Sequence, residues 1–296
     1  MSHTLKPIRE QVMVITGASS GIGLATALEA AKQGASVVLS ARSEQALSEI
    51  AARIRDAGGK AIHVAADVAD RAQVQRVADV AIETYGRIDT WINDAGVSIF
   101  GRLDQVEEDD NRRLFETNFW GVVNGSLVAL PYLKTSHGAL INIGSEVSDA
   151  VVPLQGMYSA SKHAVKGFTD ALRVELEHVD KAQIAITLIQ PTAVNTPYPQ
   201  HAANYMDREP KLPTPQIQPE AVAKAVLSAA SHHRRDMRVG AMAVLNTWTA
   251  RLLPALADKL TARQVSRQQR DAAASRDPKG ALYQPGGTGQ VRGQPA

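Results

Sequence analysis

Residues 12–23 read Val-Met-Val-Ile-Thr-Gly-Ala-Ser-Ser-Gly-Ile-Gly, and this stretch decides the fold. The β-branched run that ends at Thr16 predicts a buried strand. The apolar spacing from Ile22 to Gln33 predicts a helix that begins directly after a glycine-rich loop. A strand, a glycine-rich turn and a helix in this order indicate a site for the phosphates of a nucleotide.

Each glycine of the loop has a separate expected role. Gly17 would permit the tight turn, and Gly21 would let a pyrophosphate approach the backbone. Gly23 would allow the helix to pack closely on the strand. The free N–H groups at the start of the helix would face the phosphates. A glycine-rich turn without any ligand is the alternative interpretation.

The alternation of strand and helix continues through most of the chain. Strands are predicted over 12–16, 36–40, 61–65, 90–93, 139–143, 184–189 and 239–243, and helices over 22–33, 46–57, 73–85, 108–133, 157–178 and 219–231. This pattern predicts an α/β fold, a single Rossmann-type doubly wound domain of about seven parallel strands flanked by helices. Residues 1–245 would form the domain, 246–270 a helical extension, and the Ala-rich, then Gly/Pro-rich residues 271–296 a disordered tail.

The composition is that of an ordinary globular protein, with 44% apolar and 21% charged residues among 296. The chain has no cysteine, which excludes disulfides and thiolate metal sites, and His232-His233 lacks the clustered carboxylates of a metal site. No apolar run approaches the roughly 18 residues of a membrane span. The polar residues 1–11 have no secretion signal, and the net charge of +2 gives no indication of nucleic-acid binding. We therefore expect a cytoplasmic protein without a metal site.

Tyr158 and Lys162 lie four residues apart in the helix predicted over 157–178. Side chains at this spacing share one helix face, so the phenol and the ammonium would lie close together. A neighbouring cation lowers the pKa of a phenol from its usual value of about 10. A phenol tuned in this way can give a proton to a carbonyl oxygen or take one from a hydroxyl. Taken alone, such a pair also occurs on solvated helix faces.

Together these motifs resemble the short-chain dehydrogenases/reductases. The spacing T-G-x-x-x-G-x-G at residues 16–23 is the glycine motif of that family, and Tyr-x-x-x-Lys at residues 158–162 is its active-site signature. The resemblance covers Gln11 to Thr196, with a C-terminal extension beyond it. Further segments match in family order: the adenine-contacting pair Asp67-Val68, Asn93-Asp94-Ala95-Gly96 for Asn-Asn-Ala-Gly, the helix asparagine Asn118 and the active-site serine Ser145.

The resemblance implies a role for each matching residue. Tyr158 would be the acid in reduction and the base in oxidation, and Lys162 would lower its pKa and hold the nicotinamide ribose. Ser145 would hydrogen-bond the substrate oxygen, and Asn118 would hold a water that links Lys162 to solvent. The implied cofactor-binding residues are Gly17, Ser19, Ser20, Gly21, Ile22, Gly23, Arg42, Asp67, Val68, Asn93, Ala95, Gly96, Tyr158, Lys162, Pro191, Val194 and Thr196.

The end of the second strand indicates which nicotinamide cofactor the chain prefers. An acidic residue there would bind the ribose 2′-hydroxyl and favour NAD. Here the strand ends with Ser40-Ala41-Arg42, and a guanidinium pairs well with a phosphate. We therefore predict NADP(H) over NAD(H). A solvent-exposed arginine with no such role is the alternative.

Two positions depart from the family pattern. The family usually has Pro-Gly after the sixth strand, whereas here Pro191 is followed by Thr192, so the local backbone could differ. Asp94 replaces an asparagine and would either put a carboxylate beside the cofactor channel or turn it to solvent. Neither departure removes a residue of the active-site signature.

Residues 195–218 hold five prolines and show no clear periodicity. By the resemblance this segment would form the loop over the substrate. Tyr198, Tyr205 and Met206 would line an apolar pocket in it or simply pack. The substrate would be a carbonyl or an alcohol with some apolar body.

The extension predicts a basic amphipathic helix, because Trp248, Leu252, Leu253, Leu256 and Leu260 follow helical spacing beside basic residues. Such a helix would cover a pocket or dock on a second subunit. Peripheral contact with a membrane surface is the less favoured alternative. Members of the family are usually dimers or tetramers, so the resemblance implies a homodimer or homotetramer.

These features predict an NADP(H)-dependent oxidoreductase that interconverts a carbonyl and a secondary or primary alcohol by hydride transfer. Two other classes use the same fold. A regulatory or scaffold protein would bind NADP without turnover, and a related lyase or epimerase would consume no net NADPH.

Overall fold

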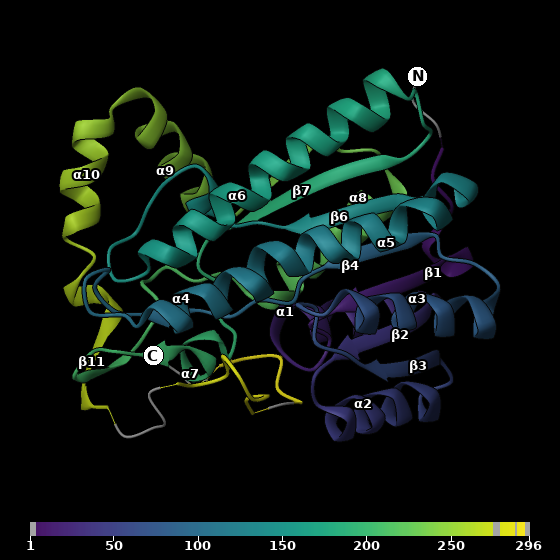
Figure 1. Cartoon of the computed structure of the whole chain (residues 1–296), viewed down its shortest axis with the longest axis horizontal. Helices are drawn as coiled ribbons and strands as arrows, with labels where there is room; N and C mark the ends of the chain where they lie inside the picture. Colours follow the sequence, from purple (N-terminus) through teal and green to yellow (C-terminus); the bar gives the residue numbers. More distant parts are fainter. Residues whose placement is uncertain (1–3, 275–278, 288, 294–296) are drawn as a thin grey trace.

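The structure is a computed structural model of the chain and describes residues 4–274, 279–287 and 289–293. A seven-stranded sheet with strand order β10-β7-β6-β4-β1-β2-β3 runs through its centre (Figure 1). All six pairings in this sheet are parallel, as the alternating pattern predicts. The strands are β1 (Val12–Thr16), β2 (Ser36–Ala41), β3 (Lys60–Ala65), β4 (Thr90–Asn93), β6 (Ala139–Ile143), β7 (Ala185–Pro191) and β10 (Asp236–Val239).

Helices cover both faces of the sheet. Their bounds are α1 (Gly21–Lys32), α2 (Glu44–Asp56), α3 (Arg71–Tyr85), α4 (Glu108–Phe115), α5 (Gly121–Ser136), α6 (Gly156–Arg173), α7 (Tyr198–His201), α8 (Pro219–Ser231), α9 (Ala241–Leu252) and α10 (Pro254–Ala262). Apolar residues of α1, α2 and α8 share one buried cluster with the sheet, and those of α3, α5 and α6 share the other. The doubly wound α/β fold expected from the sequence is confirmed.

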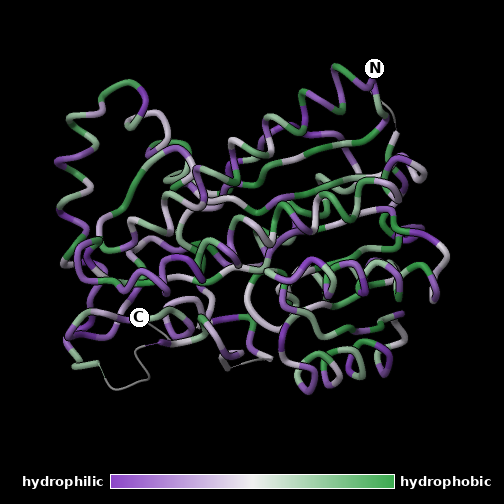
Figure 2. Tube along the Cα trace, in the orientation of Figure 1, coloured by the Kyte–Doolittle hydropathy of each residue, from purple (hydrophilic) through white to green (hydrophobic). Residues whose placement is uncertain are grey.

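The central strands are hydrophobic along nearly their whole length (Figure 2). Every residue of β1, β6 and β7 is buried. Strands that are covered on both faces need apolar residues at successive positions, which explains runs such as Val12 to Ile15. The helices carry their apolar residues on the side that faces the sheet, as their spacing predicts.

The last strand of the sheet differs from its predicted position. A strand was expected over 239–243, whereas β10 covers Asp236–Val239 and helix α9 begins at Ala241. Gly240 ends the strand with a φ of +98°, a backbone conformation that glycine adopts without strain. The helical extension therefore begins five residues before the expected boundary at residue 246.

The extension forms an arm of two helices, α9 and α10, that projects from one end of the sheet (Figure 1). After it, β11 (Gln269–Ala273) pairs antiparallel with β9 (Arg208–Pro210) of the long loop. A second small sheet pairs β5 (Ile99–Phe100) with β8 (Ala203–Asn204). Within the described residues, no helix is both long and apolar enough to cross a lipid bilayer.

The described part of the tail differs from the expected disordered segment. Residues 279–287 lie against α7 and α4, and residues 289–293 cross the glycine loop (yellow in Figure 1). The Leu282 side chain is fully buried. It packs in a small apolar cluster with Val97, Ile99, Leu114 and Ala203. This burial gives the Gly/Pro-rich segment an anchor that its composition alone does not reveal.

Candidate active site

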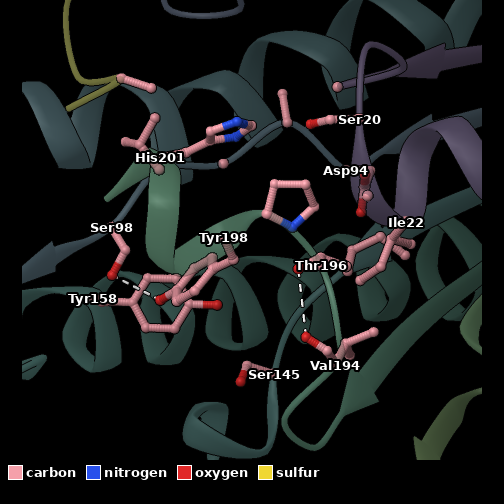
Figure 3. A pocket seen from close by; sticks show the side chains of 18 of the residues that line it. Ser20, Ile22, Asp94, Ser98, Ser145, Tyr158, Val194, Thr196, Tyr198 and His201 are labelled. Atoms are coloured by element: carbon pink, nitrogen blue, oxygen red, sulfur yellow. Dashed lines mark hydrogen bonds between the residues drawn. The ribbon is translucent and has the colours of Figure 1, made fainter. Parts of the chain in front are cut away.

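A cavity of about 280 Å³ opens at the carboxyl ends of the parallel strands. Its walls come from loops that follow β1, β2, β3, β4, β6 and β7, together with α6, α7 and the tail. The strand order reverses between β1 and β4. Ligands of doubly wound sheets bind at such a switch point. Figure 3 shows side chains from these separate segments directed into one space.

The glycine loop forms one wall of the cavity, and its geometry requires glycine. Gly17 has a φ of +72°, and a Cβ there would lie 2.8 Å from the backbone nitrogen of Ala95. Gly21 has a φ of +56° and faces Thr196. A Cβ at Gly23 would overlap the carbonyl oxygen of Gly17. These conformations and close approaches are what the sequence pattern predicts for a phosphate-binding turn.

Tyr158, Lys162 and Ser145 meet at the other end of the cavity. The ammonium of Lys162 lies 5.7 Å from the centre of the Tyr158 ring and donates a hydrogen bond to the carbonyl oxygen of Ile143 at 2.8 Å. Ser145 follows β6 and starts a short 3₁₀ helix, so its hydroxyl faces the same space. The spacing of four residues on α6 therefore brings phenol and ammonium together, as predicted.

The pKa of Tyr158 differs from the expectation. Burial raises the pKa of the phenol to about 12, although hydrogen bonds from Tyr198 and Ser145 lower it. The carboxylates of Asp94 and Glu146 raise the pKa of Tyr158 further. The sequence shows the cation at Lys162 but neither the burial of the phenol nor the two anions beside it. In the protein alone, the phenol is held in its protonated form at neutral pH.

Lys162 and Asp94 form a second pair of shifted groups. Burial lowers the pKa of Lys162 to about 8, while the negative charge of Asp94 raises it. Burial raises the pKa of Asp94 to about 7, while Lys162 and the backbone N–H of Gly23 lower it. Asp94 therefore points into the cavity beside the lysine rather than to solvent, which decides between the two alternatives for this departure.

Asn118 lies in a π-helical turn, Glu116–Trp120, between α4 and α5. Its amide nitrogen donates to the carbonyl oxygen of Val97 at 3.0 Å and to Ser161 Oγ at 3.1 Å. Its amide oxygen accepts from the N–H of Val97 at 2.8 Å. Such turns interrupt regular helices and are frequent at functional sites. The turn accounts for an asparagine in the middle of a long helical stretch.

Tyr198 forms the wall next to Tyr158. The two rings meet edge to face with their centres 5.5 Å apart (Figure 3). The Tyr198 hydroxyl oxygen lies 2.7 Å from Gln155 Oε1 and 2.7 Å from Ser98 Oγ. Of the three loop residues proposed for the pocket, Tyr198 lines the cavity, whereas the Tyr205 hydroxyl donates to Asp110 at 2.6 Å. Met206 does not belong to the cavity wall.

Glu146 links the cavity to the helical arm. Its Oε2 atom accepts hydrogen bonds from Thr192 Oγ1 at 3.1 Å and from Asn246 Nδ2 of α9 at 2.9 Å. Burial raises the pKa of this carboxyl, and the two hydrogen bonds lower it. Thr192 is the residue that replaces the usual glycine. The departure therefore supplies a donor to a carboxylate in the cavity wall.

The end of the cavity where the resemblance places adenosine, called the adenosine end below, contains Arg42, Asp67 and Val68. The guanidinium of Arg42 donates to the carbonyl oxygens of Leu282 at 2.9 Å and Ala281 at 2.6 Å. Arg42 is therefore directed into the site and is not a solvated loop residue. It is held there by the tail.

Most of the residues proposed from the sequence converge on this cavity. Three do not line it: Gly23, Asn93 and Asn118. Both ends of the Asn93 amide are hydrogen-bonded within the protein. Its nitrogen donates to Ser126 Oγ and Asn142 Oδ1, and its oxygen accepts from Trp91 Nε1. Asn93 thus connects β4 with β6 and α5 instead of facing a ligand. The cofactor-binding role expected for its side chain does not agree with this position.

Comparison with known proteins gives the family. A family model described as short chain dehydrogenase matches residues 11–206. The chain belongs to the short-chain dehydrogenases. The uncharacterized oxidoreductase YxnA of Bacillus subtilis (strain 168) is 45% identical over 259 residues, which are 86% of this chain and 72% of the relative.

Solved structures of the family agree with the fold. A short-chain dehydrogenase/reductase from Burkholderia phymatum in complex with NAD superposes with a TM-score of 0.72 at 26% identity, over 92% of this chain and 100% of the other. An alcohol dehydrogenase from Thermococcus sibiricus complexed with 5-hydroxy-NADP gives a TM-score of 0.68 at 26% identity, over 77% and 95%. This short-chain dehydrogenase is an oxidoreductase whose structural neighbours bind NAD or NADP-type nucleotides.

The sequence did not predict several residues in or beside the site of this short-chain dehydrogenase. Glu146 follows Ser145 directly, and a carboxylate beside the signature serine was a signal that could have been used. The tail gave a weaker signal, the apolar triplet Ala281-Leu282-Tyr283 within a Gly/Pro-rich segment. Arg113 of α4 does not line the cavity but donates to the same Leu282 carbonyl oxygen as Arg42, and nothing local in the sequence relates the two arginines.

Proposed function

We propose that this chain is an NADP(H)-dependent oxidoreductase that interconverts a carbonyl and an alcohol, with Tyr158 as general acid and base. The observation that carries the proposal is the meeting of Tyr158, Ser145 and Lys162 at one end of the cavity whose other end is the glycine loop. A nucleotide on the loop would extend toward the phenol. The residues present fit such a group, because the glycines put no side chain between the loop backbone and a phosphate, and Arg42 points into the site.

The bound nicotinamide would supply the hydride in reduction and accept it in oxidation. In reduction, Tyr158 would give its proton to the carbonyl oxygen while Ser145 holds that oxygen by a hydrogen bond. Lys162 would return a proton to the phenolate, and Asn118 would keep the lysine connected to solvent. With its pKa raised to about 12 by burial, Tyr158 is protonated at neutral pH in the protein alone and so carries the proton that reduction needs.

We propose NADP(H) over NAD(H) because the residue directly after β2 carries a guanidinium and not a carboxylate. A ribose 2′-phosphate there would form an ion pair with Arg42, whereas a neutral 2′-hydroxyl would leave the positive charge of Arg42 without a partner of opposite charge. The solved neighbours include both NAD and NADP-type complexes, so Arg42 is the feature that favours NADP(H).

The substrate class follows from the wall near Tyr158. Val147, Val152, Leu212 and Pro213 line this part of the cavity together with the Tyr198 ring. We propose a ketone, aldehyde or matching alcohol with an apolar body. The protein would act as a cytoplasmic homodimer or homotetramer.

A screen of NADPH and NADH oxidation over ketones, aldehydes and quinones tests the proposal. We expect turnover with NADPH at a higher kcat/KM than with NADH, and we expect Arg42→Asp to reverse that preference. A higher kcat/KM with NADH, or an unchanged preference in Arg42→Asp, would overturn the cofactor assignment. Cofactor binding without net oxidation of NADPH by any substrate would favour a regulatory protein or a lyase.

A further inference from the structure

The described tail residues are fixed across the adenosine end of the cavity. The buried Leu282 side chain is one anchor. Asp110 of α4 is the other, because it accepts hydrogen bonds from Lys279 Nζ at 3.0 Å and from the Tyr283 hydroxyl at 2.8 Å. These anchors hold the segment so that the backbone carbonyls of Ala281 and Leu282 face the interior of the site.

Two guanidinium groups converge on a single oxygen of this segment. The Leu282 carbonyl oxygen accepts from Arg42 Nη1 at 2.9 Å and from Arg113 Nε at 3.1 Å. Any oxygen atom in that position would have both arginines within hydrogen-bond distance. The second arm of the Arg113 guanidinium pairs with Asp67, and the Arg113 side chain is only 17% exposed. Arg113 is thus held in the orientation that reaches the shared oxygen.

We propose that Arg113 and Arg42 together form the site for the 2′-phosphate of NADP(H), and that the Leu282 carbonyl occupies this site until the cofactor displaces it. This inference rests on the proposed function, since it assigns a second residue to the same cofactor. It makes Arg113 a specificity-determining residue and the tail a competitor of the cofactor.

Charge explains why the exchange favours a phosphate. A carbonyl oxygen carries a partial charge, whereas a phosphate oxygen is ionised and forms stronger, shorter hydrogen bonds with a guanidinium. Burial and the nearby positive charge of Arg113 lower the pKa of Arg42, while Asp67 raises it. An anion between the two arginines would relieve their mutual repulsion. The neutral 2′-hydroxyl of NAD(H) would not relieve this repulsion, so NAD(H) should displace the tail less readily than NADP(H) does.

A second contact places the tail in the path of the cofactor. The carbonyl oxygen of Gln290 accepts a hydrogen bond from the N–H of Gly21 at 3.0 Å. This N–H lies at the start of α1, where the phosphates of a nucleotide would bind. The tail therefore puts backbone oxygens on two donors that the cofactor needs. Both contacts must break for the nucleotide to bind.

Binding of 2′,5′-ADP and 5′-ADP to the full chain, measured by calorimetry, tests the role of Arg113. We expect Arg113→Gln to weaken 2′,5′-ADP by about ten- to a hundredfold and 5′-ADP by less than about threefold. Arg112→Gln is the matched control, because Arg112 directly precedes Arg113 in α4 and pairs with Glu108 on the surface. An Arg113→Gln chain that still prefers 2′,5′-ADP as strongly as the parent would overturn the assignment.

Asp67→Asn distinguishes direct contact from a structural role. It breaks the ion pair with Arg113 but keeps the guanidinium. If Arg113 acted only by orienting Asp67, this variant would lose the preference for 2′,5′-ADP as Arg113→Gln does. If Arg113 contacts the phosphate, the preference for 2′,5′-ADP over 5′-ADP stays the same or increases in Asp67→Asn, since this change removes a negative charge near the phosphate.

Two variants test the competition by the tail. Leu282→Asp puts a charge into an apolar cluster and should release the tail, and the double change Lys279→Ala with Tyr283→Phe loosens the Asp110 anchor without altering that cluster. Both should bind 2′,5′-ADP about three- to tenfold more tightly than the parent, because fewer contacts must break. Gln284→Ala, at an exposed tail position, should change nothing. Weaker binding in both tail variants would show that the tail helps to hold the cofactor and would contradict the competition.

The outcome with Arg42 separates this inference from the proposed function. If Arg42→Asp abolishes the preference for 2′,5′-ADP while Arg113→Gln leaves it intact, the NADP(H) assignment holds and the role of Arg113 is wrong. If neither variant changes the preference, the NADP(H) assignment fails as well.

Discussion

The Tyr198 ring meets the Tyr158 ring edge to face at 5.5 Å, and a hydrogen bond from its hydroxyl lowers the pKa of the Tyr158 phenol. Tyr198→Phe would keep the ring contact and remove the hydroxyl. The pKa of Tyr158 should then rise, so less phenolate is present at a given pH. We expect the rising limb of kcat/KM for alcohol oxidation to move to higher pH, with a loss of roughly three- to tenfold at neutral pH. An unmoved limb would show that this hydroxyl does not tune the phenol.

Asp94→Asn should move the same limb in the opposite direction. The carboxylate of Asp94 raises the pKa of Tyr158 and also the pKa of Lys162. Its removal lowers both, so phenolate forms at lower pH. The effect should be largest above pH 7, because the pKa of Asp94 itself is raised to about 7 and below that pH its charge is already neutralised. Asp104→Asn, at an exposed position, is the matched control. A limb that moves to higher pH in Asp94→Asn would contradict the electrostatic account.

Thr192→Val should reduce stability in a pH-dependent way. Burial raises the pKa of Glu146, and the hydroxyl of Thr192 offsets part of that cost by donating a hydrogen bond. Without the donor, the ionised carboxylate costs about 1 kcal/mol more. The penalty applies while the Glu146 carboxyl is ionised in the folded protein and fades as the pH falls through its raised pKa, so it should be absent at pH 4. Thermal unfolding of Thr192→Val and of the parent protein at pH 4 and at pH 8 measures this difference in stability.

The matched control for this experiment is Thr249→Val on α9, whose hydroxyl donates to a backbone carbonyl of its own helix. It should give a small change that does not depend on pH. An equal loss of stability at pH 4 and pH 8 in Thr192→Val would mean that the threonine only fills space.

The arm of α9 and α10 exposes several large apolar side chains. Leu245, Trp248, Leu252 and Leu256 are 46–67% exposed. We expect this face to be covered by a second copy of the chain, so Leu252→Glu should lower the mass measured by sedimentation. Val179→Glu, at an equally exposed apolar position outside the arm, should not. An unchanged mass together with pelleting of the parent protein with anionic vesicles would favour a membrane surface as the partner.

The sequence predicted the features that depend on neighbouring residues. The positive φ angles of Gly17 and Gly21 belong to the local turn that the motif predicts, and the placement of the Lys162 ammonium over the Tyr158 ring follows from the helix period. The strand–helix alternation was sufficient for the sheet, because parallel strands require helical crossovers. Only the edge strand β10 was displaced, at Gly240.

Features that depend on distant contacts could not be predicted. Arg113 and Leu282 are 169 residues apart, and Arg42 and Leu282 are 240 apart, so no local pattern relates them. The pKa of Tyr158 was expected to fall because the sequence shows its charged neighbour on the helix. Its rise depends on burial and on Asp94 and Glu146, which tertiary packing brings to the ring.

The measurement that tests the central claim most directly is single-turnover reduction by Tyr158→Phe with bound NADPH. The account predicts that the rate falls by about 10²- to 10⁴-fold, since the proton donor is lost, while the dissociation constant of NADPH stays the same. A rate close to that of the parent protein, with NADPH bound normally, would contradict the role of Tyr158.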